Sequence, residues 1–258
     1  MDINIKEEEG FQYVEQGKGP VLLLLHGLFG ALSNWKSALD HFSKNYRVVI
    51  PIIPIYGLPV LKTNLKGMTK FVHDFVCYKN LNEVTLLGNS LGGHIALIYA
   101  LNHQERVKTM VLTGSSGLYE SAMGDSFPKR NNYDFIKSKV EYTFYSPKTA
   151  TKELVDEVFG IVNDRNKAMR IIMMAKSAVR QNLAKEIHKI KVPVCLIWGK
   201  QDRVTPPHVA EEFLERLPNA ELHFMDECGH APMMEKSEEF NAILDPFLAK
   251  HLLNQTQD

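Results

Sequence analysis

The sequence has little cysteine, with three such residues in 258, at positions 77, 195 and 228. Their number is odd and their spacing matches no metal-binding motif, so a disulfide framework is excluded and reduced thiols in a cytoplasmic protein are expected. We interpret Cys77 and Cys195 as small buried hydrophobic residues. Cys228, two residues before His230, is a candidate for the wall of a site.

The chain also has no excess of charge of either sign. Lysine and arginine total 30, aspartate and glutamate total 30, and the formal net charge is therefore +0. No basic run is longer than two residues. A nucleic acid or an anionic membrane surface is thus not the expected partner, and a small molecule is.

Long apolar runs are missing as well. The first nine residues are acidic and lack the apolar core of a signal peptide, and the longest apolar run near them, residues 21–25, is far too short to cross a bilayer. We therefore expect a cytoplasmic protein that does not bind membranes. Its oligomeric state is expected to be a monomer or a homodimer.

Short apolar runs alternate with segments of helical periodicity along most of the chain. Their apolarity is continuous, as a parallel sheet covered by helices on both faces requires. Strands are expected at residues 21–25, 47–50, 84–87, 107–112, 194–198 and 221–225, and helices at 32–42, 67–78, 91–102, 207–217 and 237–253. The more polar residues 7–16 are expected to form an antiparallel hairpin at the edge. The pattern predicts an α/β fold with a mostly parallel sheet flanked by helices.

The strand rhythm stops between residues 118 and 189. Helix-like runs occupy residues 151–162 and 166–182 of this stretch. It begins where a loop leaves the carboxyl end of a strand, the edge at which α/β proteins build their sites. We expect a core domain formed by residues 1–117 and 190–258, with residues 118–189 inserted as a helical cap or lid.

The most informative motif is the segment 88–93, which reads GNSLGG and follows an apolar run. A serine between glycines, placed between a strand and a helix, predicts a nucleophile elbow, a turn so tight that only a minimal side chain fits two residues before and two residues after the serine. The turn would expose the Ser90 hydroxyl and direct the first N–H groups of the next helix at the group under attack. A plainer interpretation is that Ser90 caps this helix.

A serine nucleophile requires a base and an acid that orients the base. Asp202 and His230 each follow a predicted strand, and the order Ser90, Asp202, His230 along the chain is the order that elbow nucleophiles use. His230 would accept the hydroxyl proton and Asp202 would hold the imidazole in the right tautomer. Asp202 could instead cap the helix that follows it, and Asp226 and Glu227 compete with it for the role of acid.

The first buried strand ends in residues 26–30, which read HGLFG. Glycines here let the backbone approach the elbow, so the N–H groups of Leu28 and Leu91 are expected to form the oxyanion hole. Phe29 is expected to line the pocket or to pack locally on the loop. His26 is expected to brace the loop rather than to act in catalysis.

These segments together resemble the α/β-hydrolase superfamily. The resemblance rests on HGLFG at 26–30, GNSLGG at 88–93, Asp202, and GHAP at 229–232, and it covers essentially the whole chain. It implies an eight-stranded sheet with a helical cap between strands six and seven, and neither a metal ion nor an organic cofactor. A serine nucleophile disfavours the haloalkane dehalogenase and epoxide hydrolase branches, which use a carboxylate.

Two features of the sequence point to different substrate classes. The GNSLGG elbow resembles that of hydrolases that cleave C–C bonds in meta-cleavage products, but those enzymes usually carry tryptophan at the position of Ala231. The GHAP and HGLFG segments look more like carboxylesterases. We therefore expect a serine hydrolase that cleaves carboxylic esters of small, mostly apolar substrates. The alternatives are a C–C hydrolase of vinylogous diketo acids and a ligand-sensing protein with slow turnover.

The substrate pocket is expected to be mostly apolar. Ala231 and Phe29 would line it near the nucleophile, and Met173 would line its roof from the cap, since methionine adapts to varied acyl groups. Core packing inside the cap is the alternative role of Met173 and its neighbours. The candidates for a cation that reaches inward from the cap are Arg165, Arg170 and Arg180, although arginine is mostly exposed.

Overall fold

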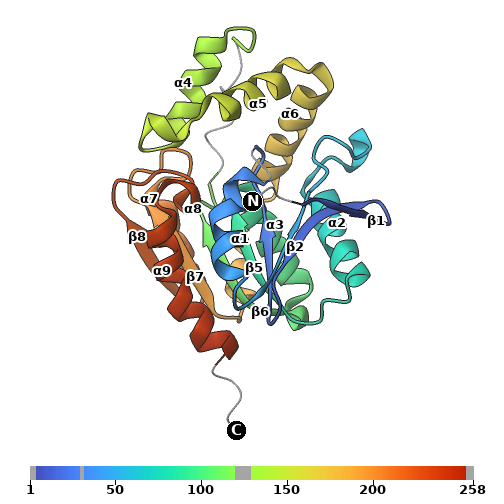
Figure 1. The fold of residues 1–258 in the computed structure, drawn as a ribbon, viewed down its shortest axis with the longest axis vertical. Helices are drawn as coiled ribbons and strands as arrows, with labels where there is room; N and C mark the ends of the chain where they lie inside the picture. Colours follow the sequence, from blue (N-terminus) through green and yellow to red (C-terminus); the bar gives the residue numbers. More distant parts are fainter. Residues whose placement is uncertain (1–3, 30–31, 120–128, 254–258) are drawn as a thin grey trace.

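An eight-stranded sheet organises the computed structural model, which describes residues 4–29, 32–119 and 129–253 (Figure 1). Its order is β1-β2-β4-β3-β5-β6-β7-β8. The strands are β1 (Lys6–Glu8), β2 (Phe11–Gln16), β3 (Val21–Leu25), β4 (Arg47–Pro51), β5 (Val84–Asn89), β6 (Val107–Thr113), β7 (Val194–Gly199) and β8 (Ala220–Met225). β3 to β8 run parallel, whereas β1 and β2 pair antiparallel at one edge. The predicted α/β class, the mostly parallel sheet and the edge hairpin are confirmed.

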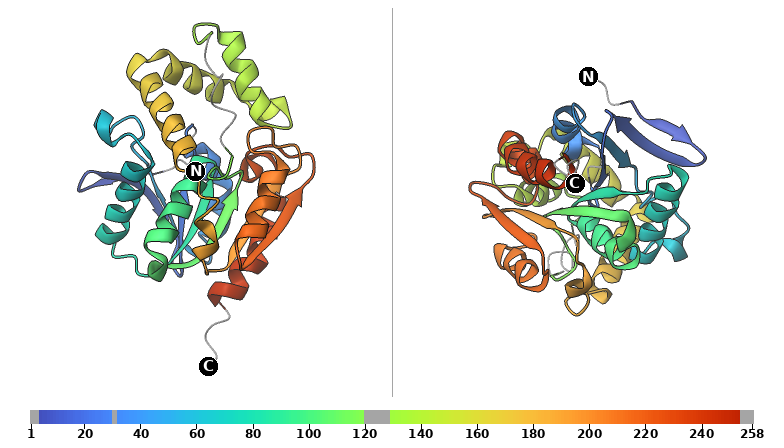
Figure 2. Two further views of the ribbon diagram at one scale, coloured as in Figure 1. Left: turned by 180° about the vertical axis from the view of Figure 1, so that it is seen from behind. Right: turned by 90° about the horizontal axis from the view of Figure 1, so that it is seen from below.

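Helices cover both faces of the sheet (Figure 2). On one face α1 contacts α9, and on the other α2 contacts α3. The helices are α1 (Lys36–Phe42), α2 (Leu65–Tyr78), α3 (Leu91–Asn102), α4 (Tyr133–Thr143), α5 (Lys152–Asn163), α6 (Arg165–Arg180), α7 (Pro207–Arg216), α8 (Pro232–Glu235) and α9 (Ser237–Leu248). Short helical turns are η1 (Ser33–Trp35), η2 (Val60–Lys62), η3 (Gln104–Arg106), η5 (Pro147–Thr149), η6 (Ile187–Lys189) and the π-helical η7 (Ala249–Leu253). No described helix is both long enough and apolar enough to cross a membrane.

The burial pattern explains why the strand sequences are continuously apolar. Every residue of β5 and of β7 is buried, because helices cover both faces of these central strands. α3 is buried along nearly its whole length and is apolar on all sides, as expected of a helix enclosed by other elements. The sequence pattern thus places the strand that carries the elbow in the middle of the core.

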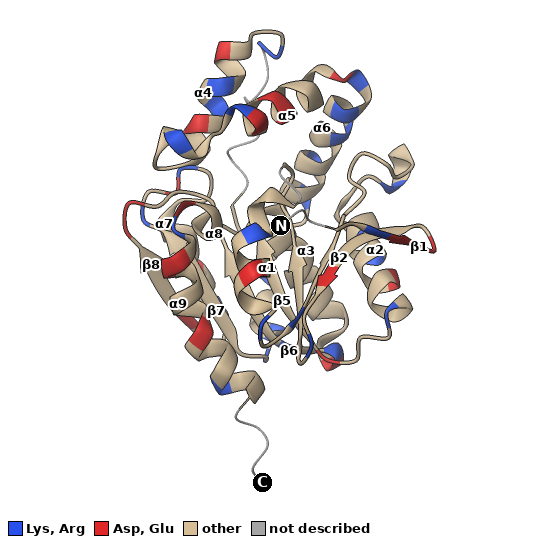
Figure 3. Ribbon diagram, viewed as in Figure 1, with Lys and Arg blue, Asp and Glu red and all other residues tan. Residues whose placement is uncertain are grey.

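The helices α4, α5 and α6 lie between β6 and β7 in the chain and sit beyond one end of the sheet (Figure 1). Acidic and basic residues are interspersed over the molecule, and both signs occur on α4 and α5, whereas the charged residues of α6 are all basic (Figure 3). Some of the apolar side chains of these three helices face inward, with Val155, Val158, Ile171 and Met174 among the buried ones, while Ile172 and Val179 of α6 are exposed. The location agrees with the interruption of the strand pattern.

Three local expectations need correction. The predicted helix 32–42 is split into η1 and α1, and the predicted helix 237–253 is α-helical only to Leu248. Cys77 is exposed, not buried: the buried face of α2 carries Val72, Phe75 and Val76, and the helical period turns residue 77 away from it. Cys195 is buried as expected.

Candidate active site

Ser90 lies at the turn between β5 and α3, with φ 54° and ψ −120°. A positive φ is strained for any residue but glycine, and it is the conformation expected of a nucleophile elbow. A Cβ added to Gly88 would lie 2.6 Å from the Cα of Gly93, and one added to Gly92 would lie 2.0 Å from the carbonyl oxygen of Leu25. Glycine is therefore required on both sides of Ser90 by close backbone contact.

His230 and Asp202 form a buried pair. His230 Nδ1 lies 2.9 Å from Asp202 Oδ2, and the Asp202 side chain is 0% exposed. The carboxylate also accepts hydrogen bonds from the backbone N–H groups of Val204 and Thr205 and from the Thr205 hydroxyl. Because the carboxylate accepts from Nδ1, His230 carries its hydrogen there and Nε2 is left as a proton acceptor.

The alternatives for the acid lie elsewhere. Asp226 is exposed, accepts a hydrogen bond from Gln201 Nε2 at 2.9 Å and lies 3.6 Å from Lys200 Nζ. The N-cap residue of α7 is Pro206, so capping that helix is not the role of Asp202. The geometry thus brings Asp202, rather than Asp226, to the imidazole of His230.

The backbone of Leu28 and Leu91 converges near the elbow. Leu91 is the first residue of α3, and the first N–H groups of a helix have no acceptor within the helix. Leu28 follows Gly27, whose added Cβ would lie 3.4 Å from the Cβ of Ser90. The Leu28 carbonyl oxygen accepts a hydrogen bond from Tyr56 Oη at 2.8 Å, which fixes this peptide.

His26 braces the same loop. Its Nε2 accepts the N–H of Ile53 at 2.9 Å, and its Nδ1 lies 2.8 Å from the carbonyl oxygen of Gly27. Burial lowers the pKa of His26 to about 4, so the imidazole is neutral near pH 7. The apolar segment 51–59 therefore supports the site, because Ile53 and Tyr56 form hydrogen bonds to His26 and Leu28 of the loop.

Ser90 and His230 line the same cavity, whose volume is about 540 Å³. Leu28, Phe29, Leu91 and Ala231 are among its lining residues. The helices α4 to α6 contribute mainly apolar side chains, including Val140, Leu154, Val158 and Ala178. The methionine of α6 that lines the cavity is Met174, not Met173, because successive residues of a helix point about 100° apart. Cys228 is buried but is not among the lining residues.

Two of the described residues that line this cavity are cationic, and neither is one of the predicted arginines. Lys139 of α4 and Arg203 are both exposed, and the Arg203 guanidinium lies 5.2 Å from the ring centroid of Tyr142. The guanidinium of Arg170 instead donates to the carbonyl oxygens of Leu58 and Asn166. Positive charge is thus available at the solvent side of the cavity rather than beside the elbow.

The loop around His230 is held by residues that sequence reasoning missed. Asn89 Nδ2 donates to the carbonyl oxygens of Thr113 and His230, at 3.0 and 3.1 Å. Glu235 Oε1 accepts from the N–H groups of Gly229 and Ala231, at 3.0 and 3.2 Å. These contacts fix the backbone on both sides of His230. The position of Asn89 inside the elbow motif is the one feature of the sequence that could have indicated this supporting role.

Glu235 also connects this loop to the helices over the sheet. Its Oε2 accepts the N–H of Tyr145 at 2.7 Å, and the N–H of His230 donates to the carbonyl oxygen of Thr143 at 3.0 Å. Burial raises the pKa of the Glu235 carboxyl, and the three N–H groups offset only part of that increase. A partly buried carboxylate that accepts three backbone hydrogen bonds is costly to remove.

We predict that Glu235→Ala lowers kcat by roughly 10- to 100-fold, because displacement of a catalytic group by about 1 Å has effects of this size. Glu235→Gln should lose less, since its amide oxygen can still accept from Gly229 and Ala231. Steady-state kinetics beside thermal melting would check this, with Glu239→Gln, at an exposed position of α9, as the matched control. Wild-type kcat in Glu235→Ala would show that the loop needs no such support.

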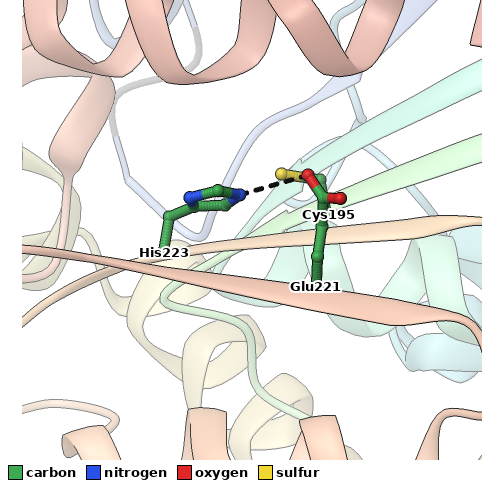
Figure 4. A group of neighbouring side chains, drawn as sticks. All are labelled: Cys195, Glu221 and His223. Atoms are coloured by element: carbon green, nitrogen blue, oxygen red, sulfur yellow. Dashed lines mark hydrogen bonds and ion pairs between the residues drawn. The ribbon is translucent and has the colours of Figure 1, made fainter. Parts of the chain in front are cut away.

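One group of possible metal ligands occurs among the described residues: Cys195, Glu221 and His223, whose ligand atoms lie within 4.8 Å of one another (Figure 4). Cys195 and Glu221 are paired in register across β7 and β8. Glu221 Oε1 and His223 Nε2 already contact each other at 3.1 Å, and burial raises the pKa of the Cys195 thiol, which disfavours a thiolate ligand. Its residues lie on β7 and β8, two and three strands from β5, and none of them lines the cavity.

Comparisons with known proteins agree with this architecture. A family model described as the alpha/beta hydrolase fold matches residues 20–157, and one described as serine aminopeptidase S33 matches residues 156–237. The solved structure of MGS-MChE2, an alpha/beta hydrolase enzyme from a sediment metagenome of the lagoon of Mar Chica, Morocco, is 42% identical with a TM-score of 0.80. The alignment covers 96% of this chain and 98% of that one.

Curated relatives point to two kinds of substrate. A 2-hydroxy-6-oxo-6-(2'-aminophenyl)hexa-2,4-dienoic acid hydrolase from Metapseudomonas resinovorans is 30% identical over 93% of this chain and 87% of its own length. The monoacylglycerol lipase ABHD6 of Bos taurus is 26% identical over 96% of this chain and 82% of its own length. Sheet, elbow and relatives define a hydrolase that acts on a small molecule. The chain belongs to the α/β-hydrolase family.

Proposed function

We propose that this protein hydrolyses carboxylic esters of small, mostly apolar substrates through an acyl-enzyme on Ser90. The observation that carries the proposal is the buried pair of His230 and Asp202, whose histidine lines, together with Ser90, one cavity with mainly apolar walls. An apolar wall suits the hydrocarbon parts of an ester, and a few polar groups suffice to orient its carbonyl.

In the proposed mechanism the Ser90 hydroxyl attacks the ester carbonyl carbon while His230 Nε2 accepts the hydroxyl proton. The negative charge that develops on the carbonyl oxygen is stabilised by the N–H groups of Leu28 and Leu91. The imidazolium then protonates the departing alcohol, and Asp202 stabilises its charge. Water then attacks the acyl-enzyme while His230 accepts one of its protons. The imidazolium returns this proton to the Ser90 oxygen as the carboxylic acid leaves, which restores the hydroxyl and the neutral imidazole.

We further propose that residues 1–117 and 190–258 are the core domain and that residues 118–189 are a cap. Support comes from the side chains that the latter stretch contributes to the cavity, among them Val140, Leu154 and Met174. Residues 120–128 lie outside the described part of the chain. A cap of this kind would set selectivity through contacts remote from the reacting carbonyl.

A C–C hydrolase of dienoic diketo acids is the second candidate. Lys139 and Arg203 favour it, because an anionic substrate needs positive charge in its site, and so does the hydrolase from Metapseudomonas resinovorans. The apolar surroundings of Ser90, with Ala231 directly after His230, favour the ester. Both cations are exposed, so neither is held beside the reacting atoms.

Competition between the two substrate classes tests the proposal. We expect kcat/KM for p-nitrophenyl acetate and butyrate to exceed that for a dienoic diketo acid, because a site that lacks a buried cation stabilises a dienolate poorly. Stopped-flow assays with purified protein measure both. A higher value for the diketo acid than for both esters would reverse the assignment. Arg203→Gln and Lys139→Gln should then slow that substrate more than acetate.

A further inference from the structure

Met234 lies between two hollows of the molecule. One is the cavity that contains Ser90, and the other is a groove of about 600 Å³ at the surface. Met234 lines both. It is half-buried, which is what a side chain with one face on a cavity and another on an open groove should be.

The backbone around Met234 is fixed. Its N–H donates to the carbonyl oxygen of Ala231 at 2.9 Å within the turn that follows His230. The turn η1 completes the partition, because Asn34 lines the cavity while its neighbour Ser33 lines the groove. The Asn34 side chain is anchored to the carbonyl oxygen of Phe29 at 3.4 Å. The flexible part of the partition is thus the Met234 side chain.

The groove is more open to solvent than the cavity. Between α1 and η5 its walls carry hydroxyl groups of Ser33, Ser37 and Thr149, and Lys36 pairs with Asp40 at 3.0 Å. An apolar chain therefore loses less contact with water in this open groove than in the more enclosed cavity. A substrate that outgrows the cavity at this end therefore meets a side chain first and water beyond it.

We propose that Met234 is the specificity-determining residue that limits how long a substrate chain the cavity accepts at this end. The inference rests on the proposed ester hydrolysis and adds its substrate class, esters whose chain is short at this end of the cavity. Removal of the thioether side chain joins the two hollows, so that a longer chain threads into the groove instead of colliding with the wall. A larger side chain at this position shortens the cavity.

The test uses p-nitrophenyl esters from acetate to decanoate with the full-length protein, and a second series that varies the alcohol. The measured quantity is the ratio of kcat/KM for the longest to that for the butyrate-sized substrate. Met234→Ala should raise this ratio at least tenfold in one series, since a few methylene groups in a pocket change selectivity by roughly 10- to 200-fold. Met234→Phe should lower it.

Matched controls separate length control from general loosening. Met174→Ala enlarges the cavity from α6 without reaching the groove, and Ser237→Ala alters the groove without touching the cavity. Neither should raise the ratio as Met234→Ala does. Length profiles of Met234→Ala and Met234→Phe that coincide with that of the wild type in both series would overturn the proposal, and so would an equal rise in Met174→Ala.

Binding of n-alkylboronic acids, from butyl to decyl, provides a readout that needs no turnover. Calorimetry should find affinity that declines beyond a certain chain length in the wild type and at a longer chain in Met234→Ala. If the wild type hydrolyses no ester at all, the proposed function is wrong, and the boronate series still decides the role of Met234. An unchanged length limit in that series would overturn it.

Discussion

Replacement of Ser90 by alanine is expected to abolish ester hydrolysis and covalent labelling by a fluorophosphonate. The hydroxyl is the group that forms the acyl-enzyme in the proposed mechanism, and loss of such a nucleophile costs about 10⁴-fold or more in kcat. Mass spectrometry of the labelled wild type should place the adduct on the peptide that contains Ser90. The melting temperature of the variant should stay close to that of the wild type, because the substitution removes only one oxygen atom from a side chain at the cavity wall.

Ser116→Ala is the matched control. Ser116 lines the same cavity, and its hydroxyl lies 3.3 Å from the carbonyl oxygen of Ser90, so the variant removes a neighbouring serine without removing the proposed nucleophile. It should retain labelling and most activity. Activity that survives in Ser90→Ala, or an adduct on Ser116, would show that the nucleophile has been misassigned.

Asp202→Asn is expected to lower kcat by about 10³- to 10⁴-fold while the protein stays folded. The amide oxygen can still accept the N–H groups of Val204 and Thr205, which holds the loop in place. The amide NH₂ would then face His230 Nδ1, a donor that favours the tautomer with its hydrogen on Nε2. That tautomer cannot accept the Ser90 proton, so the loss falls on kcat.

Asp226→Asn serves as the comparison, since this exposed carboxylate contacts Gln201 and Lys200 instead of the imidazole. It should leave kcat within a few-fold of the wild type. The ratio of the two variants is the informative number, measured on p-nitrophenyl butyrate at saturating concentration. A larger loss in Asp226→Asn than in Asp202→Asn would show that Asp226, and not Asp202, is the orienting acid.

The sheet and the elbow could be predicted from the sequence because their signals are local. Continuous apolar runs such as residues 21–25 and 84–87 have few alternatives to buried parallel strands. The glycines around Ser90 reflect backbone contacts so close that no other residue fits, and such a requirement is visible in a single chain. The roles of Ser90, Asp202 and His230 in catalysis stay predictions until the variants are measured.

Other features depend on how distant elements are placed, and the sequence alone could not supply them. The choice between Met173 and Met174 for the cavity depends on the rotation of α6 about its axis, which its neighbours set. Glu235 is unremarkable in sequence, yet the fold turns both its oxygens toward backbone N–H groups. Cys77 was misplaced because one residue of helical phase separates a buried from an exposed position.

The contacts of Thr143 and Tyr145 have a consequence for how substrate enters. The end of α4 holds the loop of His230 through the His230 N–H, and through Glu235 it holds that loop a second time. If α4 swung away from the sheet, it would pull the imidazole from Asp202, so an enzyme opened in that way would be inactive until it closed. We expect passage to depend on movement of α5 instead, because α6 is also tied to the core, by Arg170 and by the Ser177 hydroxyl, which accepts the N–H of Leu65 at 3.0 Å. The cavity can then open to substrate while His230 and Asp202 stay paired.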